Sequence, residues 1–174
     1  MAQPLHRLAK ALGAALVLLL AGPACAAPRV IAPSGDATGA ADTAAFQAAM
    51  QAGGVYALKA GGTYYLARQV AWSHDGSGFA AQGGRAKIVV LTGPGQFDQS
   101  DYAHLLGTNR IVFYDLGHDR PVLSGLVLVQ QANPAVRSVN PIVWRKAANI
   151  RLENIELPGS TIPIRPAARS GWTA

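Results

Sequence analysis

The apolar positions of this chain fall in short runs separated by turns. Many of these runs are nearly continuous stretches of Val, Ile and Leu, as is typical of strands buried in parallel sheets. No helix of useful length separates them, which argues against a doubly wound βαβ fold. The pattern predicts an all-β domain with strands at Val55–Leu58, Thr63–Leu66, Gln69–Trp72, Lys87–Leu91, Arg110–Tyr114, Pro121–Val129, Ile142–Trp144 and Asn149–Leu157.

One segment, Asp42–Ala52, has helical spacing instead. Phe46, Ala49 and Met50 fall at i, i+3 and i+4 and form one narrow apolar stripe. Asp42 is a good N-cap, because its carboxylate can accept hydrogen bonds from amides of the first turn, and the glycines that follow Ala52 end the helix. Since the end of a stack of parallel strands exposes unpaired backbone, we expect this helix to cover one end of the core.

An internal echo links two of the later runs, Val122–Leu128 and Arg151–Leu157. Gly125 matches Asn154 at an offset of 29 residues (154 − 125 = 29), and both residue types tolerate left-handed backbone. Successive coils of a solenoid give such a period, and a hairpin-built β-sandwich can mimic it. The matching apolar pairs are Leu123 with Leu152, Leu126 with Ile155, and Leu128 with Leu157.

The first 26 residues read as a secretory signal. Arg7 and Lys10 precede the uncharged run Leu12–Leu20, and Ala24 to Ala26 supply the small-x-small cleavage pattern. Cleavage leaves 148 residues (174 − 26), about one domain, with residues 27–41 as an extended lead-in. The sequence therefore predicts a secreted or periplasmic protein with no membrane span after cleavage.

The amino-acid composition limits the kinds of fold and binding partner that fit this chain. The mature chain has no cysteine, so a disulfide-stapled fold is excluded. Loss of Arg7 and Lys10 takes the net charge from +6 to +4. A modest positive balance suits an acidic polysaccharide, although a soluble basic protein without such a partner has the same charge. The basic residues are scattered rather than clustered, so no nucleic-acid partner is expected.

Several motifs carry a family resemblance. An acidic-Gly turn, an Asp-Thr pair, a small helix and a Gly-Gly-Val are followed by Gly-Thr-Tyr and apolar residues. These are Gly35-Asp36, Asp42-Thr43, Gly53-Gly54-Val55 and Gly62-Thr63-Tyr64-Tyr65-Leu66, with Ala41 where family members usually carry a first acid. Together with coil-like motifs up to residue 157, this resembles the pectate lyase-like superfamily.

The resemblance implies an all-β, right-handed parallel β-helix (solenoid) over residues 42–174, with a short N-terminal capping helix. It implies a secreted carbohydrate-active protein that acts on an acidic polysaccharide by β-elimination or glycoside hydrolysis. The polygalacturonase motifs are absent, and Gly117 to Asp119 is only a faint echo of one. The sugar, the bond and any metal, Ca²⁺ included, are left undefined.

The chain stops early for this family. Residues 160–174 begin what resembles another coil and offer no amphipathic helix to close it. We therefore expect an incomplete β-helix that self-associates through an open end. Three alternatives stand: an enzyme, a non-catalytic glycan-binding or surface solenoid, and an inactive fragment of a larger polysaccharide-degrading enzyme.

Two turn-like stretches carry the candidate chemistry, Gln96–His104 and Asp115–Arg120. Stacked coils would bring their acids together, for acid/base work on a glycosidic bond or for holding calcium. Ordinary turn chemistry explains the same acids. The catalytic candidates are Asp98, Asp101, Asp115 and Asp119. The substrate-binding candidates are His104, His118 and Arg120, with Trp144, Arg145 and Lys146 as a sugar platform with cationic neighbours or, alternatively, a core-edge Trp before a solvated turn.

Two further motifs resemble known functional signatures but do not fit their structural requirements. Gly76 to Ala81 fits a dinucleotide fingerprint loosely, but no helix follows it. Ser73-His74-Asp75 contains the letters of a catalytic triad, but adjacent residues cannot align as nucleophile, base and orienting acid.

Overall fold

The computed structural model describes residues 29–93, 96–97, 111–115, 117–132, 140–144 and 146–158. Within them lie one helix and ten strands. The helix is α2 (Ala40–Ala52), and the strands are β1 (Val30–Ile31), β2 (Val55–Lys59), β3 (Thr63–Leu66), β4 (Val70–Ala71), β5 (Gly78–Gln82), β6 (Ala86–Val90), β7 (Ile111–Asp115), β8 (Val122–Gln130), β9 (Asn140–Trp144) and β10 (Arg151–Glu156).

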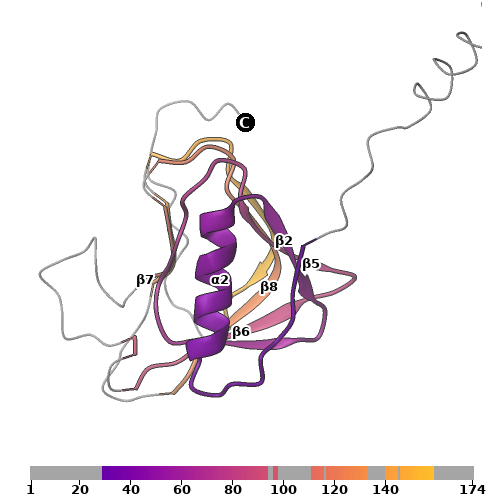
Figure 1. The fold of residues 1–174 in the computed structure, drawn as a ribbon, viewed down its shortest axis with the longest axis vertical. Coiled ribbons are helices and arrows are strands. Elements are labelled where there is room, and N and C mark those ends of the chain that lie inside the picture. The colour runs from indigo at the N-terminus through magenta and orange to yellow at the C-terminus, as the bar shows by residue number, and fades with distance from the viewer. Residues whose placement is uncertain are drawn as a thin grey trace, which may run out of the picture.

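Every strand pairing is parallel, and the strands stack in three columns. The first column is β1, β2, β5 and the first halves of β8 and β10. The second is β3, β6 and the second halves of β8 and β10. The third is β4, β7 and β9. The chain visits the columns in the same order on each pass, which gives a parallel, mostly β fold with a curled sheet (Figure 1).

The register gives the length of each pass. In the first column Val55 pairs with Gly78, Gly78 with Val122, and Val122 with Arg151. The offsets are 23 (78 − 55), 44 (122 − 78) and 29 (151 − 122) residues. The long pass contains the connection from β6 to β7. The passes are thus stacked turns of unequal length rather than strict repeats.

The 29-residue echo is confirmed. Leu152 pairs with Leu123 and Ile155 with Leu126, in parallel. Gly125 and Asn154 both adopt left-handed backbone, with φ of 67° and 51°. The hairpin alternative is excluded for this segment, because a hairpin would pair these strands antiparallel.

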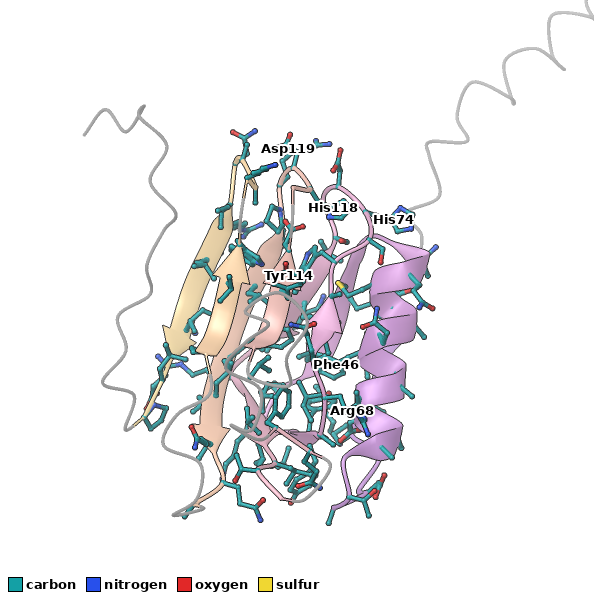
Figure 2. The ribbon with its side chains drawn as sticks, turned by 90° about the vertical axis from the view of Figure 1, so that its left-hand side faces the viewer. Phe46, Arg68, His74, Tyr114, His118 and Asp119 are labelled. Atoms are coloured by element: carbon teal, nitrogen blue, oxygen red, sulfur yellow. The ribbon has the colours of Figure 1, made fainter. Side chains whose placement is uncertain are left out.

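Aromatic rings fill the interior. The Phe46 ring of α2 lies 4.5 Å from the Phe79 ring and 5.5 Å from the Tyr64 ring, centroid to centroid. All three side chains are fully buried. Helix α2 lies across the curled sheet at its N-terminal end (Figures 1 and 2). The helix was predicted to cover one end of the core; the structure shows that it is present and that its apolar side packs against the interior of the curled sheet.

The start of α2 differs from the prediction. The helix begins at Ala40, and the N-cap residue, Gly39, has no side chain with which to cap it. Asp36 binds the first-turn amide of Ala41 at 3.0 Å. Asp42 is not the cap: it is buried, and its two oxygens accept from the amides of Ser34 and Tyr65. Because Asp42 ties the lead-in to β3, its role depends on tertiary contacts.

The sequence pattern did not predict two of the strands. β1 lies inside the expected lead-in, and β5 lies in the stretch set aside as a nucleotide-binding decoy. β5 reads Gly-Phe-Ala-Ala-Gln, so Phe79 is its one large apolar residue. Small residues carry little strand signal, and here the neighbouring strands on both sides supply the burial.

Candidate functional site

Three turns stack at the corner where the third column passes into the first. They are His74–Gly76, His118–Arg120 and Ala147–Asn149. The Gly76 amide donates to the Asp119 carbonyl (2.7 Å), and the Arg120 amide donates to the Ala148 carbonyl (2.8 Å). These bonds align the turns residue by residue, so His74 occupies the position of His118 and Asp75 that of Asp119. Figure 2 shows His74, His118 and Asp119 together at one end of the molecule.

The aligned turns share a backbone conformation. Gly76, Arg120 and Asn149 hold equivalent positions and have φ of 64°, 56° and 52°. Glycine and asparagine adopt this left-handed region readily, but a long side chain does so at a steric cost. One further pair is equivalent: Gly117 (φ 145°) and Lys146 (φ 60°). Two cationic residues therefore stand where a neighbouring turn has glycine.

Asp115 and His118 form the closest titratable pair of the corner. The His118 Nδ1 lies 2.6 Å from Asp115 Oδ1, which also accepts from the amides of Gly117 and His118 at 3.2 Å. The Asp115 side chain is fully buried, whereas that of His118 is 32% exposed. Because a carboxylate only accepts, Nδ1 carries the proton, which leaves the Nε2 lone pair free in the neutral ring.

The strand register explains why Asp115 is buried. The Trp72 amide donates to the Tyr114 carbonyl, which places Trp72 beside Asp115 in the third column, and Asp115 pairs with Trp144 on the other side. The two indole rings lie 5.8 Å apart although β7 separates their strands. The short Asp115 side chain leaves the space in which they meet. Asp115 Oδ2 and Trp144 Nε1 are both buried and have no hydrogen-bond partner.

Asp75 and Asp119 hold the turns to one another. Asp75 Oδ1 accepts from the Asp119 amide at 2.9 Å. Asp119 Oδ1 in turn accepts from the Arg120 amide (3.0 Å) and from Asn149 Nδ2 (2.8 Å). The geometry of Asp119 is therefore that of turn chemistry, which was one of its two interpretations.

The predicted binding residues divide by burial. Arg120 and Lys146 are exposed, while Trp144 is buried in the core. The burial of Trp144 favours the core interpretation over a sugar platform. Arg120 Nε lies 3.7 Å from Asp119 Oδ2, a contact between two largely exposed side chains that contributes little.

Other candidates lie outside the described residues. Asp98, Asp101, His104 and Arg145 belong to this group. The expected approach of the two acidic stretches therefore stays a prediction. Of their acids, Asp115 and Asp119 are described, and they lie in and beside the turn at this corner.

The described residues contain no group of three or more His, Cys, Asp or Glu side chains that could hold a metal ion. In the same part of the chain, no helix has both the length and the apolar character to cross a membrane.

Sequence reasoning missed His74 and Asp75 as members of the corner. The signal was present, because His-Asp recurs at 118–119, 44 residues later. It was hard to see because that pass is much longer than its neighbours. The chain matches no family model, no curated protein and no solved structure.

Proposed function

We propose that the chain is a secreted right-handed parallel β-helix that acts as a polysaccharide lyase of the pectate lyase-like type. Its substrate is an acidic polysaccharide that it cleaves by β-elimination. Three columns of parallel strands support the fold, together with the sequence motifs at its N-terminal end. A secretory signal and a net positive mature chain support the location and the substrate charge.

The pair of Asp115 and His118 carries the proposal. A buried carboxylate that binds Nδ1 orients an imidazole and leaves Nε2 as a base toward solvent. In the proposed step, Nε2 takes the proton from the carbon next to a uronate carboxylate. That electron pair forms the new carbon–carbon double bond, the neighbouring glycosidic C–O bond breaks, and the leaving oxygen acquires a proton.

The described residues favour elimination over hydrolysis. Hydrolysis of a glycoside uses two carboxyl groups that face the scissile bond. Asp115 is buried, and Asp119 Oδ1 accepts hydrogen bonds from the Arg120 amide in its own turn and from Asn149 Nδ2 in the next turn. Elimination needs one base and cations near the carboxylate, where negative charge develops. His118, Arg120 and Lys146 provide these at one corner.

The test uses polygalacturonate and alginate as substrates, with ultraviolet absorbance reporting unsaturated ends. His118→Gln should lower kcat at least roughly 100-fold, as expected for loss of a general base. Asp115→Asn should also lower kcat, with KM little changed, because the ring loses its orienting charge. Circular dichroism should show that both variants fold.

His74→Gln is the matched control, because it alters the equivalent residue of the neighbouring turn and should leave kcat within about twofold. Equal loss in this control would remove His118 from its role. Wild-type protein that forms no unsaturated ends from either polymer would reject the lyase proposal.

A second function, binding of an acidic glycan without cleavage, is favoured by one observation. Arg120 and Lys146 are exposed cations, and binding an anion needs no base. Retention on immobilised polygalacturonate, without any product, would support this alternative.

A further inference from the structure

We infer that Arg120 and Lys146 form an anion-binding site that the fold retains at the expense of backbone strain, and that its ligand is the carboxylate of an acidic sugar. The inference rests on the proposed function for the nature of the polymer. It adds that the backbones of these two cationic residues are strained, which is a physical signature by which the anion-binding role can be tested.

The strain is the first observation. Arg120 and Lys146 have φ of 56° and 60°, a region of backbone conformation that residues other than Gly and Asn rarely adopt. The fold accepts cheaper residues at the same positions, since Gly76 and Asn149 are the equivalents of Arg120, and Gly117 is the equivalent of Lys146. Strained backbone persists where the surroundings impose it, and such residues cluster at ligand sites.

The freedom of the cationic groups is the second observation. The Arg120 side chain is 68% exposed, and its one ionic contact with another described residue, Asp119, is 3.7 Å long. Lys146 is exposed and forms no hydrogen bond or ion pair within the described part of the chain. Among the described residues, no interaction of these side chains accounts for the strain that their backbones carry.

Their placement around His118 is the third observation. Arg120 lies two residues after His118 in the same turn. A Cβ added at Gly117, just before His118, would lie 3.8 Å from the Cβ of Lys146. One cationic residue therefore lies in the turn of the proposed base and the other in the adjacent turn. An arginine fork suits planar, bidentate recognition of a carboxylate, and a lysine adds a second point charge.

The experiment measures thermal stability and anion binding in the same variants, Arg120→Asn and Lys146→Asn. Asparagine is the natural residue at position 149 and tolerates the left-handed region. Each variant should raise the Tm by roughly 2–4 °C. Each should also weaken binding to polygalacturonate by about tenfold, as expected for loss of a hydrogen bond to a charged group.

Arg68→Gln is the matched control. Arg68 is exposed, has no positive φ, and lies far from His118 and Asp119 in Figure 2. It removes the same charge without relieving strain, so the Tm should not rise and binding should change less than twofold.

Binding is measured by titration in the His118→Gln background, so that no turnover contributes. If the protein proves not to be a lyase, but both asparagine variants still gain stability and lose binding, this inference holds. Unchanged binding in both asparagine variants overturns it, as does a Tm that falls in both. Dextran sulfate provides the other source of anions: if it binds more tightly than polygalacturonate, the ligand is a sulfate ester and the carboxylate assignment is wrong.

Discussion

At the residue scale, two aspartates near the start of α2 have opposite roles. Asp36 is partly exposed and binds the amides of Thr38 and Ala41, so it caps the entry to the helix. Asp42 is fully buried and accepts from the amides of Ser34 and Tyr65. The sequence made Asp42 look like the cap, because both residues stand at the edge of the helical pattern.

Asp42→Ala should therefore be strongly destabilising. It leaves two backbone amides without an acceptor, and we expect a loss of about 2–4 kcal/mol in the free energy of unfolding. Asp42→Asn keeps one acceptor oxygen and should lose less. Urea denaturation followed by tryptophan fluorescence measures both changes. If Asp42→Ala cost no more than Asp36→Ala, the anchoring role of Asp42 would be wrong.

The capping role of Asp36 predicts a pH dependence. The Thr38 hydroxyl, with the amides of Ala41 and Thr38, holds the pKa of Asp36 below its ordinary value of 3.8. A lowered folded-state pKa means that the contribution of Asp36 is present above pH 3.8 and is lost as the pH falls through the folded-state pKa. Wild-type protein and Asp36→Asn should thus differ in Tm at pH 6 and converge at lower pH. A constant difference would contradict this.

At the element scale, the bend inside β8 decides how the first and second columns join. Gly125 has φ of 67°, and an added Cβ would lie 3.0 Å from the Gly84 carbonyl oxygen and 3.1 Å from the Ala81 Cβ. Arg85, in the preceding pass, binds Asn154 and Glu156 of β10. The Arg85 side chain therefore links passes on either side of β8.

Gly125→Ala should destabilise the protein through both strain and crowding, by about 2–4 kcal/mol. Gly61→Ala is the control, because Gly61 has φ of 71° but an added Cβ there meets nothing within 4 Å. It should cost only about 1 kcal/mol. Equal losses, measured by chemical denaturation, would show that backbone strain alone matters at position 125.

At the scale of the whole molecule, α2 and the first two passes share one core. The Phe46 ring contacts Phe79 of β5 at 4.5 Å and lies 6.5 Å from Phe113 of β7. One helix side chain therefore touches strands of the first and third columns. The helix therefore belongs to the same folding unit as these strands.

Phe46→Ala should lower the free energy of unfolding by about 3–5 kcal/mol. Gln51→Ala, on the exposed side of the same helix, should change it by less than about 0.5 kcal/mol. In Phe46→Ala, hydrogen exchange should show faster opening of β5 and β7 as well as of α2. Faster exchange confined to α2 would mean that the helix is an independent lid.

The sequence by itself determined the parallel strand-rich character, the helix and the 29-residue echo, because apolar runs, helical spacing and left-handed residues are local signals. Tertiary structure alone decided the candidate site. Asp115 is buried because Trp72 and Trp144 align with it from the adjacent strands. His74 joins His118 because the passes stack with an offset of 44 residues, which depends on the length of the connection from β6 to β7. No local sequence pattern shows which residues this connection brings side by side. The polar turns therefore acquire their roles only when the passes stack.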